Sequence, residues 1–153
     1  MPSLDDVYRK FGEVSEAAQL LETQLGNILL LARGNEQDLF TAQNPELARR
    51  ILDGINKSTL GQLLKQLHPV MGSEQDLERL LVEALDARNR LAHTYYREHN
   101  LRRNTEEGRA IMITDLESLH GTLIEAYRAA LTLSGVDLDA VDIARPKRHL
   151  PIR

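Results

Sequence analysis

One long run of helical periodicity constrains this chain more than any other feature. Between Leu4 and Ala32, apolar residues recur in alternating intervals of three and four, which places them in one stripe along a helix. Ser3 suits the N-cap, and Gly34 with Asn35 suits the end of the helix. Because such a stripe must be covered by other elements, the sequence predicts an all-α bundle.

Capping signals predict two shorter helices downstream. Asn44 followed by Pro45 indicates a helix start, and the pattern weakens near Asn56. A short helix over 59–67, capped by Ser58, is expected next.

A fourth helix follows a predicted break in the chain. Pro69 and Gly72 are expected to interrupt the helical pattern, and Ser73 with Asp76 resembles a capping box. The fourth helix is predicted to run through Tyr95 or beyond.

A last long helix is predicted after a polar turn over 100–105. Asn104 with Glu107 can cap it, and its apolar stripe runs from Met112 to Leu133. The expected fold is an antiparallel bundle of about five helices, three of them long. Narrow stripes favour a homodimer, although a self-sufficient monomer fits the same periodicity.

Composition bounds the classes of protein that this chain can be. With 153 residues, it is predicted to form one helical domain over 1–135 and a basic C-terminal tail over 136–153. It has no cysteine, which excludes disulfide frameworks, zinc fingers and cysteine nucleophiles. No leader or membrane-spanning pattern is seen, so we expect a cytoplasmic protein without membrane contact.

Positive charge is concentrated in one segment. From Arg88 to Arg103 there are five arginines and the single acid Glu98, a net charge of +4, which leaves −8 on the rest of a chain whose total is −4. Such a patch attracts phosphate-bearing ligands such as RNA. The alternative reading is an ordinary solvated helix end and loop.

An arginine interrupts the apolar stripe of the fourth helix. Arg88 stands where the pattern calls for an apolar side chain, between Ala84 and Leu91. A buried guanidinium is costly without a partner, so it must extend to solvent, pair with an acid, or face a cleft or interface that binds an anion. Glu83 or Asp86 could pair with Arg88, or with nearby Arg90, in a resting state.

Asn89 and His93 are four residues apart and share a helical face, so the amide can orient the imidazole. Arg88 and His93 diverge by roughly 140° on an ideal helix. A helix distortion or a second subunit is therefore needed to bring them to one ligand.

These residue types suit metal-independent cleavage of RNA. His93 can take a proton from the ribose hydroxyl or give one to the leaving oxygen, and Arg88 can stabilise charge on the phosphate. Tyr95 and Tyr96 could stack on unpaired bases, or they could be one core and one rim residue. The predicted RNA-binding residues are Tyr95, Tyr96, Arg90, Arg97, Arg102 and Arg103.

The run ALDARNRLAHTYYREHN resembles the HEPN family. Arg88, Asn89 and His93 match its signature of arginine, a polar residue, three further residues and histidine near the end of a long helix. The resemblance implies a homodimer with a composite RNA-cleaving site. Tyr95, two after His93, also matches HEPN toxins whose tyrosine is modified by a nucleotidyltransferase antitoxin, so Tyr95 is a candidate modification site.

Three functions are left open by the sequence. The first is a HEPN-type endoribonuclease acting in defence or as the toxin of a toxin and antitoxin pair. The second is a noncatalytic module that organises a dimer or binds RNA or a partner protein, and the third is a purely structural bundle. The remaining histidines show no ligand spacing, so neither a metal nor a cofactor is expected.

Overall fold

The computed structural model describes residues 1–36, 44–71 and 75–133. Within these ranges all regular secondary structure is helical, and no strand is present. The elements are α1 (Leu4–Glu36), α3 (Pro45–Asn56), α4 (Leu60–Met71), α5 (Gln75–His93), α6 (Tyr95–His99), the 3-10 helix η1 (Asn100–Asn104) and α7 (Glu106–Leu133).

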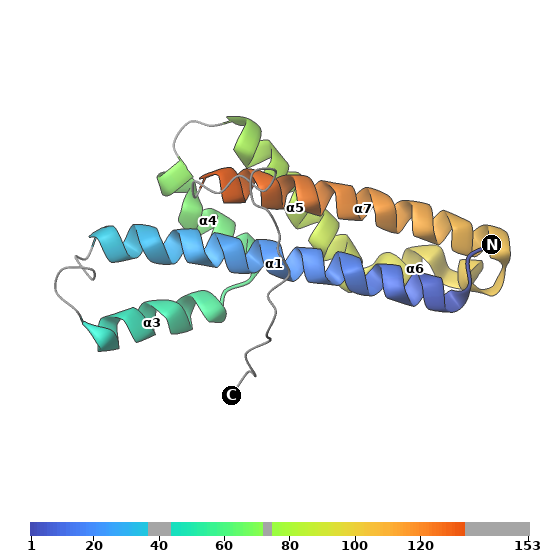
Figure 1. The fold of residues 1–153 in the computed structure, drawn as a ribbon, viewed down its shortest axis with the longest axis horizontal. Coiled ribbons are helices and arrows are strands. Elements are labelled where there is room, and N and C mark those ends of the chain that lie inside the picture. Colours follow the sequence, from blue (N-terminus) through green and yellow to red (C-terminus); the bar gives the residue numbers. More distant parts are fainter. Residues whose placement is uncertain (37–43, 72–74, 134–153) are drawn as a thin grey trace, which may run out of the picture.

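The three long helices α1, α5 and α7 form the body of the bundle (Figure 1). Contacts between α1 and α7 advance together along both chains, from Pro2 with Arg109 to Lys10 with His120, so these two helices are parallel. Helix α5 runs antiparallel to both. The predicted all-α bundle is confirmed, with successive long helices alternating in direction.

The predicted stripes form the core. Burial of these apolar side chains is the main favourable term in folding the bundle. Fully or almost fully buried side chains come from α1 (Val7, Val14, Leu21, Leu25), α4 (Leu60, Leu63, Leu67), α5 (Leu77, Leu81, Ala84) and α7 (Met112, Leu116, Leu123, Ala126).

Two predicted helix starts have the expected capping contacts. Ser3 and Asp6 form a reciprocal cap, with the Asp6 amide 3.1 Å from the Ser3 hydroxyl and the Ser3 amide 2.7 Å from the Asp6 carboxylate. Asn44 caps α3 by accepting a hydrogen bond of 3.2 Å from the Leu47 amide.

Two predicted caps are wrong by one residue. Helix α4 is capped by Thr59, which exchanges hydrogen bonds with Gln62, while the Ser58 hydroxyl donates back to a carbonyl of α3. Helix α7 is capped by Thr105, whose hydroxyl accepts from the Gly108 amide at 3.0 Å, and not by Asn104.

The helix breaks also differ from the prediction. Pro69 lies inside α4, near its end. The predicted fourth helix stops at His93, because Thr94, with φ −126° and ψ −16°, leaves helical geometry. The predicted polar turn is η1, which begins with Asn100 in the left-handed region at φ 45°.

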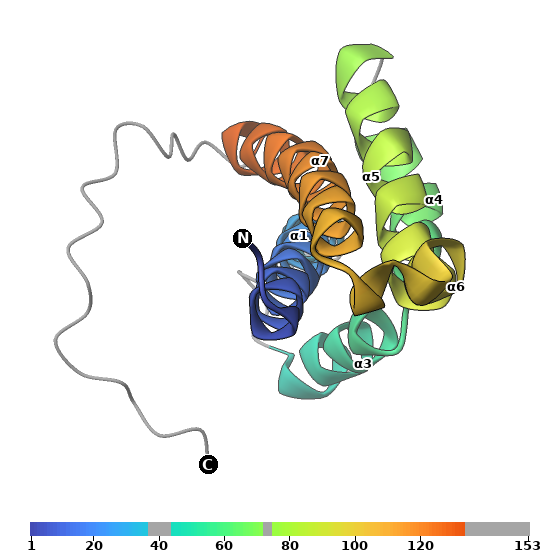
Figure 2. The same cartoon turned by 90° about the vertical axis from the view of Figure 1, so that its right-hand side faces the viewer.

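One end of the bundle faces the viewer in Figure 2. At this end the N-terminal turns of α1 lie near α6, η1 and the start of α7. This end contains the predicted site. Gly72, Ser73 and the predicted tail over 136–153 lie outside the described residues. Within the described ranges, no helix has the length and apolarity needed to cross a bilayer.

Candidate functional site

His93 lies at the last position of α5 and is exposed. Within the described ranges its ring takes part in no hydrogen bond or ion pair. It lines an open hollow of about 580 Å³ together with Asn89, Arg90, Thr94 and Glu98. The imidazole is therefore free to exchange a proton with a ligand in this hollow.

Arg88 is held by an ion pair that the sequence did not predict. Its Nε lies 3.0 Å from Oε1 of Glu22 on α1, and both side chains are about one quarter exposed, at 26% and 27%. Its Nη1 donates to Oδ1 of Asn89 at 3.2 Å. The predicted partners Glu83 and Asp86 are wrong, since Glu83 pairs with Arg79 instead.

Asn89 lines the hollow of His93, but its hydrogen bond is to Arg88 and not to His93 as predicted. The expected hydrogen bond between Asn89 and His93 is absent, and the amide oxygen of Asn89 is instead oriented by Arg88. Arg88 itself does not line the hollow of His93. One chain thus presents the imidazole and the guanidinium on neighbouring surfaces joined by Asn89.

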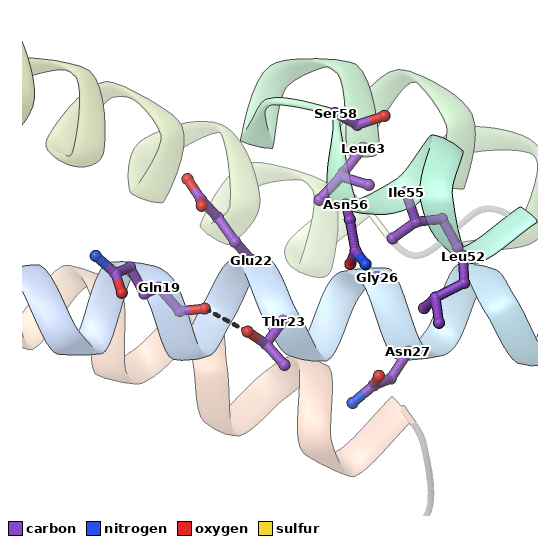
Figure 3. Close-up of a pocket in the computed structure, with 10 residues that line it drawn as sticks. All are labelled: Gln19, Glu22, Thr23, Gly26, Asn27, Leu52, Ile55, Asn56, Ser58 and Leu63. Atoms are coloured by element: carbon purple, nitrogen blue, oxygen red, sulfur yellow. Dashed lines mark hydrogen bonds between the residues drawn. The ribbon is translucent and has the colours of Figure 1, made fainter. Parts of the chain in front are cut away.

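A second hollow adjoins the Arg88 ion pair. It lies between α1 and the α3 and α4 helices, has a volume of about 360 Å³, and has Glu22 in its wall (Figure 3). Amide and hydroxyl side chains, including Gln19, Asn27 and Asn56, make its lining largely polar. Glu22 points from this wall toward α5, which explains how it reaches Arg88.

The Arg90 guanidinium is held by carboxylates of the same chain. Its two terminal nitrogens form a bidentate pair with Asp115 of α7, both at 2.6 Å, and its Nε lies 2.6 Å from Glu98. These contacts, with the Asp115 hydrogen bond the strongest cause, raise the pKa of Arg90 above its usual value despite burial. The prediction that Arg90 binds RNA does not fit this arrangement.

The two acids that hold Arg90 are kept ionised. Burial alone would raise the pKa of Asp115, but hydrogen bonds and charge from Arg90 and His99 outweigh it, so its pKa is lowered. Hydrogen bonds from Thr94 and then Arg90 lower the pKa of Glu98. Glu98 is therefore a fixed negative charge in the wall of the hollow of His93, and Asp115 is one beside Arg90.

His99 is a buried residue that the sequence analysis did not select. It is 3% exposed, and its Nε2 lies 2.5 Å from Asp115. The Arg102 guanidinium lies 3.2 Å from Nδ1, so the buried ring bridges Asp115 and Arg102. Nothing in the local pattern marks His99, because its partner Asp115 is 16 residues away on another helix.

Tyr95 belongs to the core. It is 1% exposed, its hydroxyl donates to the Met112 carbonyl at 2.9 Å, and burial raises the pKa of its phenol. The expectation that Tyr95 stacks on bases is wrong for this conformation, because its ring has no exposed face. Modification of Tyr95 would require α6 to leave its place in the bundle.

Tyr96 lies at the edge of a cluster of four rings, those of Phe11, Tyr95, Tyr96 and His99. It is 40% exposed and its ring centroid lies 5.1 Å from that of Phe11. Burial, followed by the effect of Tyr8, raises the pKa of Tyr96. Of the two tyrosines, only Tyr96 can offer a ring surface to a ligand.

The remaining predicted RNA-binding arginines are exposed. Arg97 has no hydrogen bond or ion pair within the described ranges, whereas Arg103 donates to the Tyr8 hydroxyl at 3.0 Å. Among the described residues, the Arg102 side chain hydrogen-bonds with the ring of His99 alone. All three retain donors that face solvent.

Comparison of the chain with family models, with curated proteins and with solved structures found no match in any of the three. Among the described residues, no cluster of three or more His, Asp or Glu side chains could hold a metal ion.

Proposed function

We propose that this chain is a metal-independent endoribonuclease of the HEPN type, acting as a homodimer through Arg88, Asn89 and His93. The observation that carries the proposal is the state of His93, which is exposed, has no hydrogen-bond or ion-pair partner among the described residues, and lines an open hollow together with Asn89 and Thr94. A free imidazole can accept and release a proton, as acid–base cleavage of RNA requires.

The reaction needs only groups that these residues supply. The ribose 2′-oxygen attacks the adjacent phosphorus, the bond from phosphorus to the 5′-oxygen breaks, and a 2′,3′-cyclic phosphate and a 5′-hydroxyl are left. His93 takes the proton of the attacking hydroxyl or gives one to the leaving oxygen. Arg88 offsets the charge that develops on the phosphate oxygens.

Arg88 is suited to bind a phosphate without losing its fixed position. Glu22 and Asn89 engage Nε and Nη1, while Nη2 makes no hydrogen bond within the described residues. Because Arg88 does not share the hollow of His93, a second copy of the chain supplies the arginine that faces each histidine.

Incubation of mixed RNA with the purified protein and a chelator tests this function. We expect cleavage of RNA, no cleavage of DNA, and products that end in a 2′,3′-cyclic phosphate. His93→Ala and Arg88→Ala should each lower the rate by about 100-fold or more. Arg79→Ala, which removes another paired arginine of α5, is the matched control and should cleave like the wild type.

A noncatalytic RNA-binding module is the second candidate. The ion pair between Arg88 and Glu22 favours it, because a guanidinium already bound to a carboxylate can serve the fold alone. Binding of RNA by the wild type and by all three variants, without any cleavage, would select this candidate over the nuclease.

A further inference from the structure

A third hollow adjoins the hollow that His93 lines. It is open, has a volume of about 600 Å³, and lies against α7 where α6 and η1 pack on it. Arg90 lines both hollows, so they are neighbours on one face of the molecule. Volumes of this size accommodate small ligands.

The charge of this hollow favours an anion. Arg90 lines it but is already bound by Asp115 and Glu98. The available guanidinium is therefore that of Arg102, against the single lining carboxylate of Asp115. That carboxylate is already bound by Arg90 and His99. Arg102 is exposed, and within the described part of the chain only its Nη1 makes a hydrogen bond, to His99, so it can still donate to a phosphate.

Other side chains that line this hollow suit a nucleobase. Ile111 is a large apolar side chain that is 49% exposed and lines the hollow. The hydroxyls of Thr114 and Ser118 follow it along α7, and Thr114 still has acceptor capacity after donating to the Ala110 carbonyl. An apolar surface beside hydroxyls and a cation can hold a base and its phosphate together.

We infer that this hollow is a second nucleotide subsite, which holds the unpaired ribonucleotide next to the one whose phosphate lies at His93. Arg102 binds the phosphate of that nucleotide, and Ile111 packs against its base. The inference rests on the proposed function for its place beside the cleaved bond. The binding of single-stranded RNA that it requires can be measured without cleavage.

Equilibrium binding of a short fluorescein-labelled single-stranded RNA to the His93→Ala protein, at several salt concentrations, tests the subsite. Adding Arg102→Ala should weaken binding about tenfold and lower the slope of log affinity against log salt by about 0.7, as expected for one lost phosphate contact. Adding Ile111→Ser should weaken binding several-fold and leave the slope unchanged, because no charge is removed. Arg102→Lys should restore most of the slope.

The matched control is Arg79→Ala, an exposed arginine on α5 that lines neither hollow. Far-ultraviolet circular dichroism verifies that each variant is folded. If Arg102→Ala and Ile111→Ser bind RNA like their parent, the subsite is wrong even if the wild type cleaves RNA. If both weaken binding as described while the wild type cleaves nothing, the subsite stands and the nuclease does not.

Discussion

Arg88 and Arg90 are two residues apart on one helix, but they differ in how many carboxylates bind them. Arg90 uses all of its nitrogens on Asp115 and Glu98. Arg88 has a single carboxylate partner and retains a free terminal nitrogen. The sequence does not separate the two, because the difference depends on which helix brings a carboxylate to each. Of these two arginines, only Arg88 retains the capacity to bind a phosphate.

Asp115 should contribute stability that depends on pH. At pH 7, Asp115→Asn is expected to lower the free energy of unfolding by about 2 kcal/mol, because charge-assisted hydrogen bonds to Arg90 and His99 are lost. The pKa of Asp115 is lowered in the folded state. Its contribution is thus fully present above the unfolded pKa of about 4 and is lost as the pH falls through the folded pKa.

Urea denaturation of both proteins between pH 7 and pH 3 measures this dependence. The gap in unfolding free energy between wild type and Asp115→Asn should narrow below about pH 4. Asp86→Asn, at an exposed position of α5, is the control and should show no such gap. A gap that stays constant down to the lowest pH would mean that packing, and not charge, makes Asp115 stabilising.

The junction between η1 and α7 depends on one glycine. A Cβ atom added at Gly108 would lie 2.1 Å from the Arg102 carbonyl oxygen, which is part of the backbone and cannot rotate away. Gly108→Ala should therefore displace η1 and lower the free energy of unfolding by about 2 kcal/mol.

Gly121→Ala in the same helix is the matched control. No atom lies within 4 Å of a Cβ at Gly121, so the substitution should stabilise the protein by up to about 1 kcal/mol through helix propensity. Thermal denaturation of the two variants gives the comparison. Equal melting temperatures would contradict the close approach of η1 to α7.

Helix existence was predictable from the sequence, and several helix boundaries were not. The start of α3 follows from Asn44 and Pro45, which suit the N-cap and the first position of a helix. Ser58 and Thr59 are adjacent, and either hydroxyl can cap α4. Which of the two caps α4 depends on the path of the chain from α3, and the local sequence does not determine that path. The break at Thr94 likewise has no glycine or proline to mark it.

The alternating direction of the long helices brings the residues of the candidate site together. Because α5 runs antiparallel to α1, Glu22 meets Arg88 although 66 residues separate them. The sequence identified His93 and Asn89 by their spacing, and the structure brings them to one hollow. It could not identify Glu22 or Asp115, since pairing across helices depends on their relative register. The sequence left Tyr95 open between base stacking and a core position, because its place on the apolar stripe and its place beside His93 predict opposite environments, and the structure has it in the core.

A site shared between two copies of the chain can be tested by mixing inactive variants. Arg88→Ala and His93→Ala should each be inactive alone. After unfolding and refolding together in equal amounts, about half of the dimers should be heterodimers, each with one intact site made of one chain's arginine and the other's histidine. Activity should therefore recover to about one quarter of that of the wild type.

The controls for this experiment follow from the same geometry. A double variant carrying both substitutions, refolded with either single variant, leaves no site with both residues intact and should stay inactive. Recovery that is absent in every mixture, from proteins shown to be dimeric by analytical ultracentrifugation, would mean that the arginine and the histidine must come from one chain. That outcome would require Arg88 to leave Glu22 and turn toward the hollow of His93, because in the described conformation the two residues do not share it.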